Sequence, residues 1–427
     1  MKNTLSQVDP RIAALIDSEN VRQRDGIELI ASENFTSSAV REAVGSSLTN
    51  KYAEGYPGRR YYGGCEVVDD VEALAIERGK QLFQAEHINV QPHDGSGANR
   101  AMYRAAGLRA SRETDLARDM LVSLGGGVEH LTHGKSVSAS GKDHAVRHFG
   151  LLPDSFEIDV DGAAAIAREV QSQMKVLMLG HSSYPKIIPA SVFSRLAQIA
   201  HDAGAKFVVD MAHFAGLVAG GVHPSPVPDA DFVSSTSHKT LRGPRAGFVI
   251  SQSAHAKELN RAVFPELQGG PHMHVIAGKA VCFHEALQPA FREYALQIIR
   301  NTRALAEGLR ENGIEVFGGE EDANHLLLLD VTAHNGPTGK VAENALNAAG
   351  LTVNKNMLPF DTRPPLDPSG IRVGTPAITT RGMKETEMTQ IAGWVSDIIK
   401  NPGDTDKQAK VHSAVTELTS HFSLPGQ

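Results

Sequence analysis

The sequence predicts an α/β protein whose large first domain holds a mainly parallel sheet and whose smaller second domain is α+β. Short apolar runs with the length of buried strands recur in the first part of the chain, at 175–179, 206–210, 231–234 and 246–250. A helix-like segment, 190–203, separates the first two of them. Strands that alternate with helices are typical of parallel sheets, because a crossover must return the chain to the same end of the sheet before the next strand starts.

The pattern changes after about residue 285, which is the second observation behind this fold class. The elements expected there are a long amphipathic helix over 291–311, strands near 315, over 325–331 and over 371–373, and helices from 383 onward. We therefore expect two domains. Residues 1–285 comprise an N-terminal arm and the large domain, and residues 286–427 form the small domain.

Composition excludes several classes of protein. The 427 residues are 41% hydrophobic and 21% charged, and the net charge of −7 provides no basic surface for nonspecific nucleic-acid binding. No apolar run approaches the roughly 18 residues that a membrane span needs. The polar residues 1–8 do not resemble a secretory signal, and Cys65 and Cys282 are too few for a disulfide framework. We expect a cytoplasmic protein without membrane or nucleic-acid partners.

The most informative stretch is 235–240, Ser-Thr-Ser-His-Lys-Thr, which follows the apolar run at 231–234. Its lysine, Lys239, is a candidate for holding an aldehyde cofactor as a Schiff base. Asp210 ends the preceding strand and supplies the carboxylate that would keep a pyridine nitrogen protonated, so that the ring accepts carbanion electrons. Either residue alone is more often an ordinary loop lysine or strand-end carboxylate. The combination predicts pyridoxal 5'-phosphate.

A small-residue turn at 94–99, Asp-Gly-Ser-Gly-Ala-Asn, is the candidate phosphate site. Backbone N–H groups at the start of a helix lack partners, and the helix dipole also favours an anion there. A Gly-Ser-Gly turn by itself is weak evidence, since most such turns are structural loops.

Several motifs occur together with these two sites and in a fixed order. They lie at 28–35, 48–57, 60–66, 130–134, 210–220, 237–245, 268–271 and 370–377. In this order they resemble the serine hydroxymethyltransferases, and the resemblance runs through most of the chain. It implies the fold-type I architecture of pyridoxal-phosphate-dependent transferases, with a seven-stranded, mainly parallel sheet in the large domain.

The resemblance also implies the cofactor-binding residues. Gly95 and Ser96 match the phosphate-binding pair, and His130 matches the histidine that stacks on the cofactor ring. The other residues implied to lie around the cofactor are Ser182, Tyr184, Asp210, His213, His238, Lys239 and Gly270. Nothing in the sequence requires a metal ion.

Substrate-binding residues are implied in the same way. Arg372, assisted by Ser32, matches the arginine that grips the amino-acid carboxylate, a task suited to a planar guanidinium. Tyr52, Glu54 and Tyr62 lie in a loop that reaches the neighbouring subunit's site in this family. Glu54 is the expected acid–base group, and the expected catalytic residues are Lys239, Glu54, His130, Tyr62 and Tyr52. A homodimer with shared active sites follows, and pairing of dimers into tetramers is left open.

The implied reaction interconverts serine, or an α-substituted serine such as α-methylserine, with a glycine-type amino acid by cleavage of the Cα–Cβ bond. Tetrahydrofolate would accept the one-carbon unit, with Leu131, Asn354 and Phe264 on the pterin side. One alternative is a folate-independent aldolase or transaldolase of β-hydroxy amino acids. Another is a noncatalytic cofactor-binding regulator, which is disfavoured by the joint presence of Lys239, Asp210, Glu54 and Arg372.

The chain departs from the family pattern near the expected site. Asp94 stands where the family has serine, which puts an anion beside the phosphate turn. Glu266 stands at a glycine position that normally assists the partner's phosphate, and Gly97 and Ala246 are further changes. The largest departure is the extended segment 107–129, whose end places Glu129 beside the stacking histidine, where the family binds the pterin. The sequence leaves folate binding open for this reason.

Overall fold

The computed structural model describes residues 4–109 and 119–426. Its larger sheet has seven strands in the order β4-β10-β9-β8-β7-β5-β6. All pairs from β6 across to β9 are parallel, whereas β10 is antiparallel to both neighbours. The strands are β4 (His87–Asn89), β5 (Met120–Leu124), β6 (Ala145–Phe149), β7 (Met174–Gly180), β8 (Lys206–Asp210), β9 (Phe232–Thr236) and β10 (Gly247–Ser251). The expected α/β class with a mainly parallel seven-stranded sheet is confirmed.

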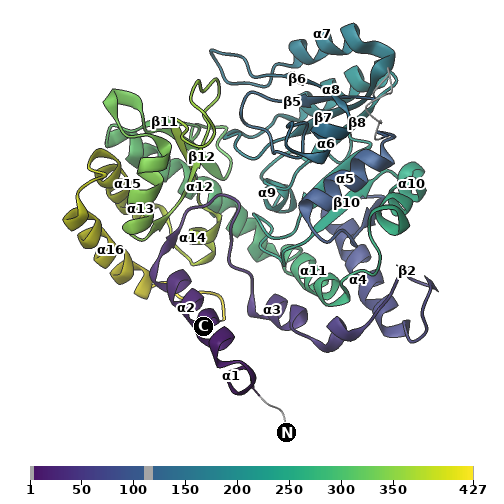
Figure 1. The fold of residues 1–427 in the computed structure, drawn as a ribbon, viewed down its shortest axis with the longest axis horizontal. Helices are drawn as coiled ribbons and strands as arrows, with labels where there is room; N and C mark the ends of the chain where they lie inside the picture. Colours follow the sequence, from purple (N-terminus) through teal and green to yellow (C-terminus); the bar gives the residue numbers. More distant parts are fainter. Residues whose placement is uncertain (1–3, 110–118, 427) are drawn as a thin grey trace.

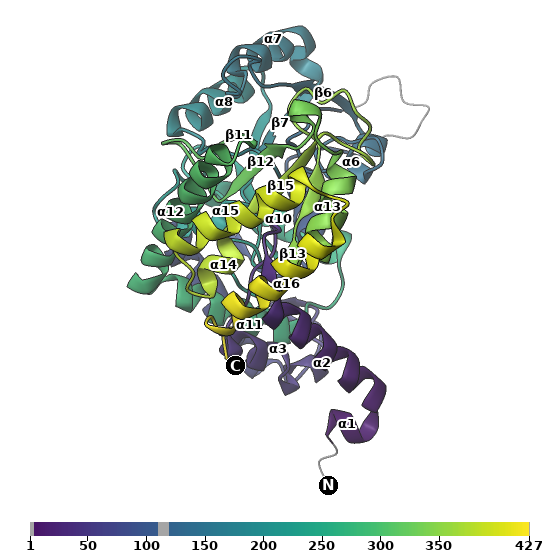
Figure 2. The same ribbon diagram turned by 90° about the vertical axis from the view of Figure 1, so that its left-hand side faces the viewer.

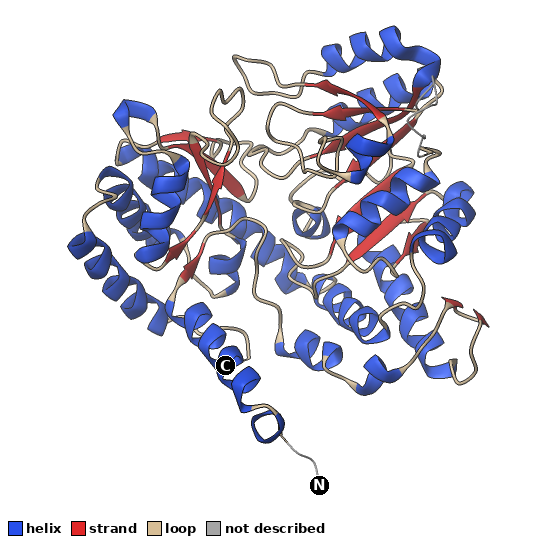
Figure 3. Cartoon of the chain, in the orientation of Figure 1, coloured by secondary structure: helices blue, strands red, loops and turns tan. Residues whose placement is uncertain are grey.

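Helices cover this sheet, as the blue elements around the red arrows in Figure 3 show. They are α4 (Glu66–Phe83), α5 (Gly95–Ala105), α6 (Ala139–Asp143), α7 (Val160–Val170), α8 (Ala190–Asp202), α9 (Ala215–Ala219), α10 (Ala256–Arg261) and α11 (Met273–Ala286). Strand β9 is buried along its whole length and β8 at every residue except Lys206, as expected for a parallel sheet with helices on both faces. The continuous apolar runs in the sequence reflect this two-sided burial.

A second, four-stranded antiparallel sheet has the order β11-β12-β15-β14 and lies to the left in Figure 1, in the green and yellow C-terminal part. Its strands are β11 (Glu315–Phe317), β12 (Leu326–Asp330), β14 (Asn354–Asn356) and β15 (Gly370–Gly374). The helices of this part are α12 (Pro289–Glu311), α13 (Gly339–Ala348), α14 (Pro376–Thr380), α15 (Glu385–Lys400) and α16 (Thr405–Ser420). Figure 2 shows α15 and α16, in yellow, on the side of this part that faces the viewer.

The N-terminal segment packs on this second sheet's domain. Strand β1 (Ile27–Glu28) pairs in parallel with β13 (Leu351–Thr352), and Ile27 and Leu29 are fully buried in the hydrophobic core that β12 and α15 share. The remaining elements before the large sheet are α1 (Leu5–Val8), α2 (Pro10–Asp25), α3 (Ser38–Val44), and the hairpin of β2 (Gly55–Tyr56) and β3 (Arg59–Arg60). The domain boundary near residue 285 stays a prediction, but residues 27–29 belong to the smaller core.

No helix in the described ranges combines the length and the apolar character needed to cross a bilayer.

Candidate active site

A cavity of about 550 Å³ lies at the carboxyl ends of the central parallel strands. Strands β7, β8 and β9 end at its wall, the first turn of α5 closes one side, and β15 of the smaller sheet closes another. Parallel sheets characteristically bind ligands at this edge. Ten predicted residues line the cavity: Ser32, Gly95, Ser96, His130, Ser182, Asp210, His213, His238, Lys239 and Arg372.

Asp210 is held as a buried carboxylate at the end of β8. Its Oδ2 accepts hydrogen bonds from His133 Nε2 at 3.0 Å and from Asn99 Nδ2 at 2.9 Å, and its Oδ1 accepts one from the Ala212 N–H at 2.9 Å. Burial alone would raise the pKa of Asp210, but these donors and the nearby cation of Lys239 lower it below the ordinary value. The carboxylate is therefore ionised at neutral pH and can stabilise a positive charge in the cavity.

Lys239 follows β9 and has its side chain buried in the cavity wall. Burial lowers the pKa of its amine to about 8, opposed by Asp210 and reinforced by Arg372 and Arg245. Its backbone carbonyl accepts a hydrogen bond from Asn34 Nδ2 at 2.9 Å, which fixes the segment. A large share of the amine is consequently neutral near pH 8, the state in which lysine attacks a carbonyl carbon.

Arg372 is only 8% exposed on β15. Within the described chain its guanidinium donates to three neutral oxygen atoms: Ser182 O at 2.6 Å, Asn354 Oδ1 at 3.2 Å and Ser32 Oγ at 3.4 Å. Burial lowers its pKa to about 10, so it remains a cation at neutral pH. A buried guanidinium with only neutral contacts favours an anion as its further partner, and a carboxylate fits its planar geometry.

The histidines around the cavity are neutral. Burial lowers the pKa of His130 to about 4 and the pKa values of His181 and His238 to about 3, with nearby charges as smaller contributions. Lys239 and Arg372 repel additional positive charge, so neutral rings suit this part of the site. His130 Nδ1 lies 2.7 Å from Thr132 Oγ1, which orients the ring.

The predicted phosphate turn begins α5. Asp94 is the helix N-cap, and its Oδ1 accepts a hydrogen bond from the Gly97 N–H at 2.6 Å. A side chain at Gly95 would place its Cβ 2.6 Å from Thr236 Cγ2, so the close approach of α5 to β9 requires glycine there. Helix start, buried lysine and buried carboxylate line one cavity, an arrangement that fits pyridoxal phosphate.

Eight predicted residues do not line this cavity, and four of them lie close together elsewhere. Tyr52 OH lies 3.3 Å from Glu54 Oε1, and the rings of Tyr52 and Tyr62 have centroids 5.1 Å apart. Tyr52 and Tyr62 are exposed in the single chain, and Gly270 packs against the ring of Tyr52. These residues form a second cluster on the surface, which we call the tyrosine cluster (Tyr52, Glu54, Tyr62 and Gly270).

The residues predicted for the pterin side are dispersed. Leu131 is exposed and lines a different cavity, Asn354 contacts Arg372, and Phe264 packs edge-on against Tyr61. The side chain of Tyr184 is buried beside His181. Within the extended segment 107–129, residues 110–118 lie outside the described ranges, and the Arg109 N–H donates to Asp119 Oδ2 across them.

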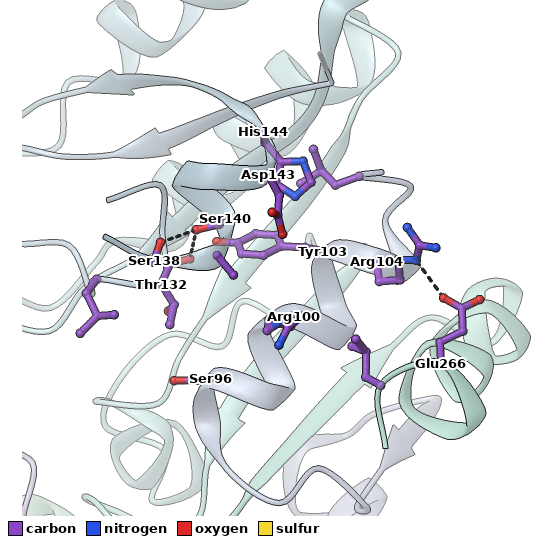
Figure 4. A pocket seen from close by; sticks show the side chains of 14 residues that line it. Ser96, Arg100, Tyr103, Arg104, Thr132, Ser138, Ser140, Asp143, His144 and Glu266 are labelled. Carbon is purple, nitrogen blue, oxygen red and sulfur yellow. Dashed lines mark hydrogen bonds and ion pairs between the residues drawn. The ribbon is translucent and has the colours of Figure 1, made fainter. Parts of the chain in front are cut away.

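Two of the three acidic departures, Glu129 and Glu266, form ion pairs. Glu129 is buried, pairs with Lys135, and accepts a hydrogen bond from the Gly127 N–H at 2.9 Å. Glu266 pairs with Arg104 at 2.8 Å and with Arg261 at 3.1 Å. Figure 4 shows the Glu266–Arg104 pair at the rim of a second cavity of about 540 Å³, beside α5. Both oxygen atoms of the Glu266 carboxylate are therefore paired with arginines of the same chain.

Sequence reasoning assigned no role to several residues of the site. Asn99 and His133 hold Asp210. Both lie in recognised motifs, Asn99 five residues after Asp94 and His133 three residues after His130. Glu33, His181 and Arg245 line the cavity. His133 could have been identified from the sequence, because it lies three residues after His130 in the same motif. His181 carries no local signal, because a lone histidine after an apolar run is most often an ordinary buried residue.

Comparison with known proteins agrees with this geometry. The family model described as serine hydroxymethyltransferase matches residues 5–395. The chain belongs to the serine hydroxymethyltransferase family.

Similar proteins extend over nearly the full chain. A serine hydroxymethyltransferase of Acidobacterium capsulatum is 53% identical over 426 residues, which is 100% of this chain and 96% of the relative. One from Myxococcus xanthus is 52% identical over 421 residues, and one from Koribacter versatilis is 50% identical over 424, each covering 99% of this chain and at least 96% of the relative. The predicted family and fold-type I architecture are confirmed.

Proposed function

We propose that this protein is a pyridoxal-phosphate-dependent enzyme that interconverts serine and glycine, with tetrahydrofolate as the one-carbon acceptor. The supporting observation is that one cavity combines buried Lys239, ionised Asp210 and Arg372, whose contacts in the described chain are to neutral oxygens. Family membership supplies the reaction class.

Each residue has a task that follows from its surroundings. Arg372, with Ser32, binds the substrate carboxylate and so fixes the amino acid in one orientation. Lys239 holds the cofactor and exchanges a proton as a base, because burial keeps its pKa near neutrality. Asp210 stays ionised and would stabilise a protonated nitrogen of the cofactor. The cofactor supplies an electron sink for the carbanion left by Cα–Cβ cleavage.

The remaining predicted residues complete the site. Neutral His130 provides a flat face for the cofactor ring without adding a positive charge next to Lys239. Gly95 and Ser96 offer the start of α5 to the phosphate, and Ser182, His213 and His238 border the same space. These assignments rest on the geometry of the cavity together with the family resemblance.

A homodimer with shared sites is part of the proposal. In the single chain the tyrosine cluster is exposed and separate from the cavity, although Glu54 is the acid–base group that the family pattern assigns to the substrate hydroxyl. A partner subunit would bring its own cluster to this cavity. A cytoplasmic location and any pairing of dimers remain predictions.

The aldolase alternative has no specific observation in its favour. The visible spectrum of the purified protein with glycine, measured before and after tetrahydrofolate is added, distinguishes the folate-dependent enzyme from the aldolase. A long-wavelength band that folate strongly enhances supports the proposed function, together with glycine formation from serine. A glycine complex that does not respond to folate would instead favour an aldolase that uses a free aldehyde.

A further inference from the structure

Two buried histidines from different sheets meet behind the cavity. His213 follows β8 of the large sheet, and His325 directly precedes β12 of the smaller sheet. His213 Nδ1 and His325 Nε2 are 3.2 Å apart, and both rings are almost completely buried. One of these two nitrogens must carry the shared proton, because a hydrogen bond between imidazoles needs one donor and one acceptor.

The environment makes both rings neutral. Burial lowers the pKa of each well below its ordinary value, and the cations of Lys239 and Arg372 lower it further. Each ring therefore carries one proton on one nitrogen. Which nitrogen carries it is decided by the hydrogen bonds available to the four ring atoms.

The second ring nitrogen of His325, Nδ1, decides which of the two histidines donates the hydrogen bond. His325 Nδ1 is buried and has no hydrogen-bond partner within the described chain. If His213 were the donor, the proton of His325 would have to lie on this Nδ1, as a buried N–H without an acceptor. Orphaned buried N–H groups are the rarer kind of unsatisfied group. The favoured arrangement has His325 Nε2–H donating to His213 Nδ1, which leaves the proton of His213 on Nε2.

His325 is itself firmly anchored. Its backbone carbonyl accepts a hydrogen bond from the Thr375 N–H at 3.1 Å, just beyond β15. The preceding residue, Asn324, donates from Nδ2 to Tyr184 O at 2.8 Å and to Lys186 O at 3.0 Å. On the other side, His213 O accepts from Thr240 Oγ1 at 2.8 Å, next to Lys239. The ring pair thus joins the segments that carry Lys239, Ser182 and Arg372.

We infer that His325 is a positioning residue that holds His213 as an Nε2–H donor facing the cavity, where it meets an oxygen of the bound cofactor. The inference rests on the proposed function for the identity of that cofactor. Because His325 directly precedes β12 of the smaller sheet, the proton of His213 is held on Nε2 only when the two domains are correctly packed against each other.

The proton position is tested on the cofactor-free protein. Histidines labelled with ¹⁵N are examined by long-range proton–nitrogen correlation, and His213→Gln identifies the signals of His213. The expected pattern is a protonated Nε2 and a bare Nδ1. A protonated Nδ1 at His213 in the unaltered protein would overturn the inference, whatever the cofactor does.

The consequence is tested by cofactor affinity in His325→Phe and His325→Gln. The phenyl ring cannot donate, whereas the glutamine amide can replace Nε2–H, so we expect about tenfold weaker pyridoxal phosphate binding for the first and less than about threefold for the second. Equal affinity of the His325→Phe variant and the unaltered protein would contradict the inference. An equal loss of cofactor affinity in His325→Gln and His325→Phe would also contradict the inference, provided that circular dichroism shows both variants to be folded.

His223→Phe is the matched control. His223 is also buried and neutral, but its ring nitrogens contact Ile188 N and Pro224 O outside the cavity, so its loss should leave cofactor affinity unchanged. Failure of the unaltered protein to bind pyridoxal phosphate would count against the proposed function, and the proton position at His213 would still decide the inference.

Discussion

Two buried cations, Lys239 and Arg372, share one cavity with a single strongly held carboxylate, Asp210. Burial lowers the pKa of His181 to about 3 and that of the Lys239 amine to about 8, and the nearby charges modify both values. At the level of single residues, these groups would suit the carboxylate of an amino acid at Arg372 and an aldehyde cofactor at Lys239.

The first residue-level prediction concerns pH. The rate at which the cofactor-free protein captures pyridoxal phosphate should rise with pH through a midpoint near 8 and level off well above it, because only the neutral amine of Lys239 attacks the aldehyde. Stopped-flow absorbance measures this rate. Asp210→Asn should move the midpoint to lower pH, since Asp210 raises the pKa of Lys239. A midpoint near the value for free lysine, about 10.4, would contradict the predicted burial of Lys239.

The second residue-level prediction concerns amino-acid binding by Arg372. Arg372→Ala should weaken binding of serine and glycine about a hundredfold, which corresponds to about 3 kcal/mol for two lost charge-assisted hydrogen bonds. Arg372→Lys keeps the charge but loses the planar guanidinium. Its affinity for the amino acids should therefore lie between that of the unaltered protein and that of Arg372→Ala. Equilibrium titration measures the affinities for serine and for glycine. Pyridoxal phosphate affinity should change by less than about threefold in these variants, and an equal loss for cofactor and amino acid would exclude a role confined to the carboxylate.

Among the elements, the start of α5 has the clearest double role. Its N-cap is a carboxylate, Asp94, at the place where the family has serine, and the same turn presents Gly95 and Ser96 to the cavity. A carboxylate satisfies helix N–H groups well, but it also places a negative charge near the expected phosphate. Helix stability and cofactor affinity therefore make opposite demands on this residue.

Substitutions at Asp94 separate the two demands. Asp94→Ala should lower the free energy of unfolding by about 1 kcal/mol through loss of the cap, whereas Asp94→Ser should keep most of it. Asp94→Ser should also bind pyridoxal phosphate about twofold to fivefold more tightly at low salt, because one repulsive charge is removed. Chemical denaturation and cofactor titration measure these effects. Weaker cofactor binding by Asp94→Ser would show that the carboxylate assists the turn more than it repels the phosphate.

For the whole molecule, the notable feature is that the smaller core includes residues from the beginning of the chain. Ile27 and Leu29 are buried with residues of β12, β15 and α15, and β1 extends along β13. We predict that a fragment comprising residues 286–427 is unstable alone and that adding residues 10–30 as a separate peptide stabilises it. Circular dichroism and thermal unfolding measure the effect. A fragment that unfolds cooperatively without the peptide would contradict this dependence.

The shared-site homodimer predicts complementation between two inactive variants. Lys239→Ala removes a residue of the cavity, and Glu54→Gln removes one of the tyrosine cluster. Mixed dimers would contain one site with both residues intact, so co-refolded variants should recover up to about a quarter of the unaltered activity, because half the dimers are mixed and each has one intact site. Each variant refolded alone is the control. Absence of recovery in dimers shown to be mixed would place both residues in the same subunit's site.

Agreement between sequence and structure differs from one part of the molecule to another. The strand ending at Asp210 was located to the residue, and the other expected strands and the helix ending at Glu311 agree within two residues, because long apolar runs report burial directly. The residues of the phosphate turn and of the Lys239 segment were identified from motifs. The association of residues 27–29 with the smaller core was not expected, since a two-residue strand carries no periodic pattern.

The sequence by itself determined the α/β class, the family, and the ten residues that meet in one cavity, because apolar periodicity and contiguous motifs are local properties of the chain. Only the tertiary structure decided that Asn99 and His133 hold Asp210, that Glu266 pairs with two arginines, and that His325 contacts His213. Apart from the pair of Arg261 and Glu266, these contacts join side chains far apart in the sequence. Their energies depend on distance and burial in the folded chain, which no local pattern encodes.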